Sequence, residues 1–416
     1  MIFCNLIKFH FLHSWEQRKL KDLIVDLKSG LSRMLKNEDI GVPVVRANNI
    51  EDNKLDMNND VKYWYNPDPQ GAKIENYTIK KDDILINFIN SEAKMGTATI
   101  VKKTPIRPII YTTNILRMRT NTLLKPYFYL THTNLQQYKN YIKQIMKPAV
   151  NQASFTTVDY KNYNLKIPKE DEQHKIELIF KNIDNLITLH QRECDQLKEL
   201  KKSMLKKMFP RDESSIPEVR FAGFTDAWEQ RKLREIAEFN PKSELPEEFE
   251  YVDLESVSGT EMISHRTELK KSAPSRAQRL AKTGDVFYQM VRPYQKKNYL
   301  FEKDDDNYVF STGYAQMRPY IDSCFLMSFL QTDKFVKVVL DNCTGTSYPA
   351  INSNDLSNLK IDVPNKRMEE VKIGEYFRSL DNLITLHQRN YNSLNRCKFS
   401  KITKNLLISH MVFIRK

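Results

Sequence analysis

The nine residues Asp184-Asn-Leu-Ile-Thr-Leu-His-Gln-Arg192 recur letter for letter as Asp381-Asn-Leu-Ile-Thr-Leu-His-Gln-Arg389. A second motif precedes each copy, because Trp15-Glu-Gln-Arg-Lys-Leu20 returns as Trp228-Glu-Gln-Arg-Lys-Leu233. The order of the two motifs is the same in both halves of the chain, whereas the sequence between them differs almost completely. Shared motifs around two variable segments predict a duplicated protein. Its constant parts would dock a common partner, and its variable parts would recognise different targets.

A long helix is predicted around each copy of the nine-residue repeat. Apolar positions that alternate steps of four and three residues form the seam of a coiled coil. The first seam runs from Ile183 through Ile187, His190, Cys194, Leu197, Lys201, Met204 and Met208. The second seam contains Leu380, Ile384, His387, Tyr391 and Leu394, and then Lys398, Lys401 and Asn405. The three polar residues predict that the second seam weakens after Leu394.

Seven seam residues are predicted to bind across the helices or to a partner: Ile183, Ile187, His190, Leu197, Leu380, Ile384 and His387. His190 and His387 occupy matching seam positions, which favours two interface residues that contact polar groups across an antiparallel helix pair. No further ligand clusters beside either histidine in the sequence, so no metal site is predicted.

Each variable segment has the pattern of a mixed α/β domain. Strand-like runs occur at 83–89 and 285–291, and helical stretches follow at 127–143 and 324–341. The predicted fold class is therefore α/β (α+β), with two mixed α/β domains separated by two long antiparallel coiled-coil helices in an internal pseudo-twofold repeat. The predicted bounds are 14–168 for the first variable domain, 169–210 for the first helix, 211–226 for a linker, 227–364 for the second variable domain and 365–410 for the second helix.

Composition indicates an acidic partner and a reducing compartment. Lys and Arg number 65 against 52 Asp and Glu, a formal net charge of +13 that favours a polyanion such as nucleic acid. The 5 cysteines are far apart and form no C-x-x-C pair, which predicts neither a disulfide framework nor a zinc site. No apolar run approaches the roughly 20 residues of a membrane-spanning helix. We therefore expect a soluble, cytoplasmic protein with no membrane partner.

Two alternatives to a DNA-binding subunit arise from the residues. Asp83, Glu92 and Lys94 have the spacing of a metal-dependent nuclease, in which carboxylates hold the ion and the lysine activates water. This spacing is common by chance, and Asp285 in the second half has no equivalent Glu-x-Lys after it. The other alternative is a coiled-coil scaffold that does not bind DNA. The sequence also has no phosphate-binding G-x-x-x-x-G-K-[ST] motif, no Gly-rich loop for S-adenosylmethionine and no recognisable Ser/His/Asp or Cys/His nucleophile group. No catalytic residue is therefore predicted.

Loops that mix cations, amides and hydroxyls are the candidate DNA-binding residues. Cations suit phosphates, while Arg and Gln side chains can make paired hydrogen bonds to base edges. In the first half the candidates are Lys94, Arg107, Asn151, Gln152 and Ser154. In the second half they are Arg292, Tyr294, Gln295, Lys296, Lys297, Thr346, Ser347 and Tyr348.

The ordered set of motifs resembles the specificity subunits of bacterial type I restriction–modification systems. The resemblance rests on the segments 224–233, 284–287, 311–313, 345–352, 356–364 and 380–384, and on 151–152, 165–168, 172–173 and 183–187 in the first half. It covers residues 14 to 395. It implies two target recognition domains that each read half of a bipartite DNA site, and helices that set the gap and dock two methylation subunits. Restriction subunits would complete the enzyme. S-adenosylmethionine, ATP and Mg²⁺ would be held by those partners, with no cofactor in this chain.

Overall fold

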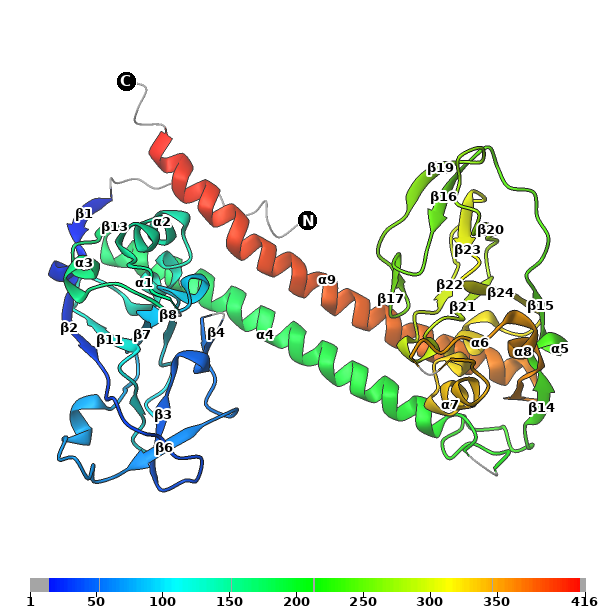
Figure 1. Ribbon diagram of the computed structural model, residues 1–416, viewed down its shortest axis with the longest axis horizontal. Coiled ribbons are helices and arrows are strands. Elements are labelled where there is room, and N and C mark those ends of the chain that lie inside the picture. Colours follow the sequence, from blue (N-terminus) through cyan, green and yellow to red (C-terminus); the bar gives the residue numbers. More distant parts are fainter. Residues whose placement is uncertain (1–14, 52, 151, 212–213, 346, 412–416) are drawn as a thin grey trace. The chain divides into compact units, whose positions relative to one another are not determined.

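The computed structural model describes residues 15–51, 53–150, 152–211, 214–345 and 347–411, and for 399–411 the backbone alone. The chain divides into two compact units (Figure 1). Unit 1 combines Met1–Leu189 with Tyr391–Lys416, and unit 2 is His190–Asn390. Both long helices therefore contribute to both units, and each unit is described by itself below.

Unit 1 is built on a four-stranded antiparallel sheet in the order β2-β11-β7-β9, formed by Ile24–Ser29, Ile115–Thr120, Ile84–Asn87 and Ala98–Ile100. A second sheet has the order β10-β3-β6, formed by Ile110–Tyr111, Gly41–Val45 and Lys62–Tyr65, with β10 and β3 parallel. The repeated strand β1 (Glu16–Lys19) pairs with β13 (Asn164–Ile167). Two short ladders join β12 (Ala153–Ser154) to β8 (Ile89–Asn90), and β4 (Ile50–Glu51) to β5 (Lys54–Leu55).

Helices α1 (Pro126–His132), α2 (Gln136–Ile145) and α3 (Thr157–Lys161) lie at one end of unit 1, and β3 and β6 lie at the other (Figure 1). The buried face of the main sheet packs with α1–α3 and with Ile176 and Phe180 of α4 (Glu170–Lys207) in one apolar cluster. Gln173, which is 1% exposed, fixes the start of α4, because it donates to the carbonyls of Leu123 and Pro168 and accepts from the Lys125 amide. Unit 1 is thus held to the first turns of α4 by its core.

Unit 2 repeats this plan. Its four-stranded antiparallel sheet has the order β15-β24-β21-β22, formed by Ala237–Phe239, Tyr314–Pro319, Val286–Gln289 and Tyr299–Leu300. A second sheet has the order β19-β16-β23-β20, formed by Arg266–Leu269, Glu248–Val252, Tyr308–Ser311 and Ala277–Leu280. The repeated strand β14 (Glu229–Lys232) pairs with β25 (Lys360–Val363), and β17 (Val257–Ser258) pairs with β18 (Glu261–Met262).

The helices of unit 2 are α5 (Leu233–Ile236), α6 (Ser323–Leu330), α7 (Asp333–Asp341), α8 (Ser353–Asn358) and α9 (Arg367–Met411). Figure 1 shows α6–α8 at the end of the unit where α9 begins, and β16, β19, β20 and β23 at the other end. The ring of Phe209, just past α4, stacks on Phe377 of α9 at 5.7 Å between centroids and meets Trp228 edge-on. The repeated tryptophan therefore anchors the constant helices to the core of unit 2.

The two variable segments share one topology although their sequences differ. Strands β2, β11, β7 and β9 correspond in order to β15, β24, β21 and β22, and the parallel pair β3 and β10 corresponds to β16 and β23. Helices α1, α2 and α3 correspond to α6, α7 and α8. Two mixed α/β domains with long packed helices confirm the predicted fold class. Unit 2 adds β20 as a further strand of its second sheet.

The predicted helices at 127–143 and 324–341 each divide into two, which the sequence analysis did not expect. In unit 2 the break falls at Thr332, whose hydroxyl donates to the Phe329 carbonyl at the end of α6 and accepts from the Phe335 amide at the start of α7. In unit 1 the Thr133 hydroxyl donates to the Leu130 carbonyl. These side chains satisfy backbone groups at helix ends, which stabilises the interruption.

The seam pairs α4 with α9 in antiparallel fashion. In unit 2, Lys201 forms an ion pair with Asp381, while the Cys194 thiol lies 3.5 Å from Oε1 of Gln388. In unit 1, Lys398 forms an ion pair with Asp184. An acid on the facing helix therefore balances the charge of Lys398, and the predicted weakening of the seam after Leu394 stays a prediction. The side chains of Lys401 and Asn405 lie outside the described residues.

Cysteine pairing and membrane spans also bear on the sequence predictions. Cys194, Cys324 and Cys343 are free thiols, whereas Cys397 is disulfide-bonded, a pairing that the spacing did not predict. Among the described residues, no helix combines the length and apolar character needed to cross a membrane.

Candidate DNA interface

Two loops of unit 2 bring most of the predicted residues of the second half together. Residues 292–297 follow β21, and residues 343–350 precede α8. Val291 forms an isolated bridge with Ala350, and the Arg292 amide donates to the Pro349 carbonyl at 2.8 Å. The Arg292 guanidinium lies over the ring of Tyr348, 4.5 Å from its centroid. The two loops thus form one surface, on which Tyr294 is 50% exposed and Tyr348 is 65% exposed.

The backbone of the first of these loops is strained at two residues. Arg292 and Lys296 both have φ of +53°, in the left-handed region that side chains with a Cβ rarely adopt. Each such residue costs on the order of 1–3 kcal/mol, and strained residues gather at functional sites. The side chain of Gln289, buried in β21, accepts a hydrogen bond from the Lys297 amide and donates one to Gln295. The sheet therefore holds the loop in place. This strain supports a functional role for the loop.

The two lysines of this loop have protein partners. Nζ of Lys296 lies 2.7 Å from Asp333 and 2.8 Å from the Gln331 carbonyl. Nζ of Lys297 lies 3.5 Å from Glu255. Their charges are therefore partly balanced within unit 2, and both side chains brace the loop. Ser347 is exposed, and Thr346 lies outside the described residues.

Lys94 and Ser154 lie at the equivalent place in unit 1. Lys94 follows β8, and Ser154 in β12 pairs with Ile89 in β8. Gln152 is exposed just before β12. Nζ of Lys94 lies 3.4 Å from Glu51, an exposed pair of little strength. The loop that follows β7 and β8 in unit 1 and β21 in unit 2 is thus the shared location of candidates in both halves.

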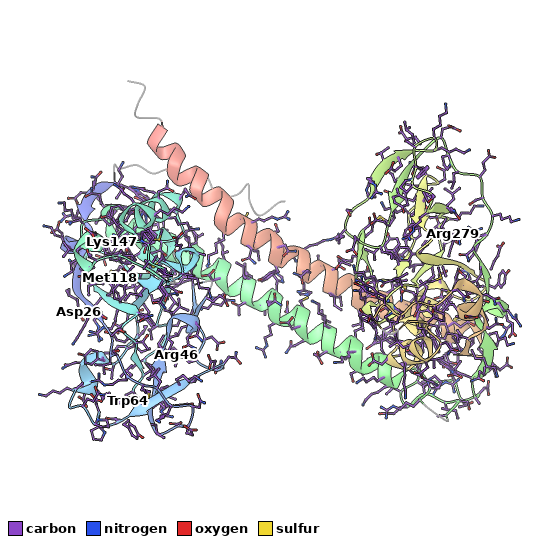
Figure 2. The ribbon with its side chains drawn as sticks, in the orientation of Figure 1. Asp26, Arg46, Trp64, Met118, Lys147 and Arg279 are labelled. Atoms are coloured by element: carbon purple, nitrogen blue, oxygen red, sulfur yellow. The ribbon has the colours of Figure 1, made fainter. Side chains whose placement is uncertain are left out.

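Lys94 also borders a polar cleft of about 570 Å³ in unit 1. The cleft is lined by Leu31, Ser32, Arg33, Arg46, Ala47, Asn48, Asn90, Ser91, Lys94, Thr112, Thr113 and Asn114. Arg46, labelled in Figure 2, forms an ion pair with Asp60, and Arg33 forms one with Asp68. The three asparagines give the cleft amide groups of the kind that contact base edges. These asparagines could not be selected from the sequence, because residues 31–48, 90 and 112–114 come together only through the sheets.

Arg107 lies elsewhere in unit 1. Its guanidinium bonds both carboxylate oxygens of Asp39, at 2.6 and 2.8 Å, and also the Gly41 carbonyl. The Asp39 partner holds the Arg107 pKa above its usual value, and the Arg107 hydrogen bond lowers the Asp39 pKa. Arg107 therefore braces the loop before β3. Asn151 lies outside the described residues.

Arg279 is a cation that the sequence analysis did not select. It lies on β20 of unit 2 and is labelled in Figure 2. Its Nε is buried without a hydrogen-bond partner among the described residues, and burial lowers its pKa. The described residues supply no acceptor for this nitrogen, and a buried charged donor without an acceptor is costly.

The nuclease alternative fails on the position of Asp83. This carboxylate is 2% exposed and accepts from Nε and Nη2 of Arg119, at 2.7 and 3.0 Å. Unit 2 has the same arrangement, in which Asp285 binds Arg318 at 2.9 and 2.8 Å. A carboxylate that is buried and paired in both repeats holds the sheet together and is not available to a metal ion.

The fold and these surfaces define a duplicated protein whose two α/β domains carry different loops on one scaffold, joined through paired helices. A family model described as the type I restriction modification DNA specificity domain matches residues 13–199 and 225–396. The chain belongs to this family. It is a non-catalytic specificity subunit, the part of a type I restriction enzyme that determines which DNA target is recognised.

Individual relatives agree with this family over nearly the whole chain. A protein of Methanocaldococcus jannaschii assigned as the type I restriction enzyme MjaX specificity subunit is 25% identical over 431 residues, covering 96% of this chain and 94% of that protein. The S subunit of the type I restriction-modification system from M. genitalium has a similar fold, with a TM-score of 0.64 at 14% identity over 96% of this chain and 97% of the other. A chain from a structural study of complex assembly and conformational transition of the type I R-M system also has a similar fold. Its TM-score is 0.50 at 16% identity, over 94% of this chain and 97% of the other. The protein is thus one part of a larger type I assembly.

Proposed function

We propose that the domains 14–168 and 227–364 are target recognition domains that each read one half of a bipartite, asymmetric DNA site. The paired helices, 169–210 and 365–410, set the gap between the half-sites, with 211–226 as a linker. The observation that carries this proposal is one topology repeated with different loops at equivalent places. Two readers on one support bind cooperatively only when the half-site spacing fits, because the second binding event is then intramolecular.

The reading residues that we propose differ in role. Arg292, Gln295 and the exposed Tyr294 and Tyr348 contact the half-site of unit 2. Lys94, Gln152, Ser154 and the amide-lined cleft contact the half-site of unit 1. Lys296 and Lys297 keep the loop 292–297 in shape, and Arg107 braces the loop before β3.

Methylome sequencing of a host strain with and without this gene, with its methylation subunit present, tests the proposal. We expect deletion to remove methylation at one bipartite motif, because no other subunit would supply its sequence preference. The two halves of the lost motif identify both recognition sequences at once. Unchanged methylation at every motif, in a strain shown to express the chain and its methylation subunit, would contradict the proposal.

The partners are two methylation subunits, which dock on the constant helices, and restriction subunits, which join them in the cytoplasm. The partners hold S-adenosylmethionine, ATP and Mg²⁺. The seam itself faces inward: Ile187 and Leu380 are each 6% exposed, and Ile183, Leu197 and Ile384 are half-buried. The adjacent leucines are exposed instead, with Leu186 at 39% and Leu189 at 48% in one copy and Leu383 at 44% and Leu386 at 52% in the other. Identical exposed leucine pairs in both copies favour two identical partners.

Replacing Leu186 and Leu189 with glutamate is expected to remove one of the two methylation subunits from the purified complex. The matching change at Leu383 and Leu386 should remove the other, because each pair would place two charges in an apolar contact. Native mass spectrometry counts the subunits. Leu178→Glu is the control, since Leu178 is 47% exposed on the same helix but corresponds to Glu375 in the second copy. Full stoichiometry in both double variants would show that docking lies elsewhere.

A further inference from the structure

Three metal-ligating side chains meet where α4 and α9 pair in unit 2. His190 and Glu193 come from α4, and His387 comes from α9. Nδ1 of His190 lies 3.1 Å from Nδ1 of His387, and Oε2 of Glu193 lies 2.9 Å from Nδ1 of His387 and 3.7 Å from Nδ1 of His190. Three potential ligand atoms thus surround one small volume between the helices.

The size of this triangle suits a tetrahedral metal ion. Ligands at about 2.0–2.1 Å from Zn²⁺ in tetrahedral geometry are separated by about 3.3 Å. The three observed separations of 3.1, 2.9 and 3.7 Å lie on either side of that value. Small side-chain movements would therefore equalise the edges, and the backbone of either helix could stay in place.

Hydrogen bonding alone leaves this triangle poorly satisfied. A neutral imidazole carries one N–H, and an ionised carboxylate carries none. One proton on Nδ1 of His387 can be shared between Glu193 and His190. The lone pairs on Oε2 of Glu193 and on Nδ1 of His190 then still face each other with no proton between them. Charging both histidines would instead place two cations about 3 Å apart beside one carboxylate. A divalent cation at the centre binds all three lone pairs without either conflict.

We propose that His190, Glu193 and His387 bind a divalent transition-metal ion, with Zn²⁺ the best match. Two imidazoles and one carboxylate are a ligand set that Zn²⁺ accepts, and imidazole also suits Ni²⁺ and Cu²⁺. The side chains of His190, His387 and Glu193 are 20, 19 and 38% exposed, so an ion can enter and a water can complete the coordination. The Cys194 thiol is directed at Ile384 and Gln388 and is not a ligand.

This proposal revises the expectation of no metal site, which rested on the lack of a third ligand near the histidines. Glu193 supplies it, because residues three apart on a helix lie on the same face. The second copy of the repeat has Asn390 at the position of Glu193. The first copy therefore supplies His190 and Glu193, and the second copy supplies only His387. The two copies together form a single site.

The bound ion would cross-link the two helices at a fixed register. Two of its ligands belong to α4 and one to α9, so sliding either helix would break a metal bond. The site stands on the geometry of unit 2 and is independent of how the loops contact DNA.

Titration of the metal-free, full-length chain with Zn²⁺, followed by calorimetry, tests the proposal. We expect one strongly bound ion per chain. Removing a ligand that bonds the metal should cost at least as much as removing its supporting partners, so His190→Gln and His387→Gln should each weaken binding by about 100-fold or more. Glu193→Gln should weaken it by about tenfold or more. Zn²⁺ should also raise the melting temperature of the wild-type chain and leave that of His387→Gln unchanged.

Matched variants separate this site from binding elsewhere. His174→Gln and Glu199→Gln alter exposed residues on the same helix and should bind Zn²⁺ like the wild-type chain. Circular dichroism establishes that the variants keep their helices, and visible absorption of bound Co²⁺ reports its coordination directly. Absence of Zn²⁺ binding by the wild-type chain would overturn the proposal. Equal affinity in the His190→Gln/His387→Gln double variant would do the same.

Discussion

Asp285→Ala is expected to destabilise unit 2 by about 3 kcal/mol or more. The Asp285 carboxylate is fully buried and accepts from Arg318, from Nε2 of Gln316 and from the Lys282 amide. Removing one partner of a buried ion pair costs about 3–5 kcal/mol because the other charge stays behind. The Arg318 side chain is 30% exposed, so water reaches it and the lower end of that range applies.

Hydrogen exchange of the full-length chain provides a readout for each unit separately. In Asp285→Ala, peptides of β21 and β24 should lose protection while those of β7 and β11 keep it. Asp83→Ala is the matched variant in unit 1 and should give the reverse pattern, because Asp83 binds Arg119 and the Lys80 amide. Asp304→Ala removes an exposed carboxylate from unit 2 and should change protection little. Unchanged protection in both buried-aspartate variants would show that these ion pairs do not stabilise the sheets.

The long helices could be predicted from the sequence because their periodicity is a local property. The predicted helices, 169–210 and 365–410, overlap the observed α4 and α9 within a few residues at each end. The ion pair of Lys398 could not be predicted in the same way, because its partner, Asp184, lies on the other helix. The local sequence shows only that a seam position carries a charge. The opposite charge on the facing helix becomes visible only when the two helices are paired.

The shared topology of the variable domains could not be predicted from their sequences. Asp83 illustrates the difficulty, since its spacing to Glu92 and Lys94 suggested a nuclease whereas its real partner is Arg119 on a neighbouring strand. Asp285 and Arg318 repeat that pair, so the equivalence of Asp83 and Asp285 was a signal present in both halves. Recognising it requires the sheet order, which brings residues about 35 positions apart into contact.

The DNA-binding role of the candidate residues stays a prediction. Arg292 and Tyr348 were selected from two separate stretches of sequence, and the structure shows that the loops carrying them lie together in unit 2. In contrast, Arg107 was selected for its charge alone, and charge does not reveal that Asp39 already occupies its guanidinium. The count of cations in a loop therefore overstates the number that are free to bind phosphate.

Arg292→Ala is expected to relax sequence preference in one half-site and leave the other half-site unchanged. Arg292 is held by strained backbone and by the Tyr348 ring, so its guanidinium is oriented before DNA arrives. A paired contact between arginine and a base contributes about 1–3 kcal/mol of discrimination, which corresponds to roughly 5- to 150-fold. Methylome sequencing of a strain that carries the variant measures this loss at each base of both half-sites.

Two further variants distinguish base reading from simple attraction to phosphate. Arg292→Lys keeps the charge but loses the planar pair of donors, so it should keep most of the DNA affinity and still lose discrimination. Lys271→Ala removes one exposed charge from the same unit and should lower affinity slightly for every sequence, with preference intact. If Arg292→Ala behaved like Lys271→Ala, Arg292 would be a phosphate contact and the reading residue of unit 2 would lie elsewhere on the surface formed by its two loops. Loss of preference in Arg292→Ala and Arg292→Lys alike would assign Arg292 to a base edge, since the two variants differ in charge and share only the missing guanidinium.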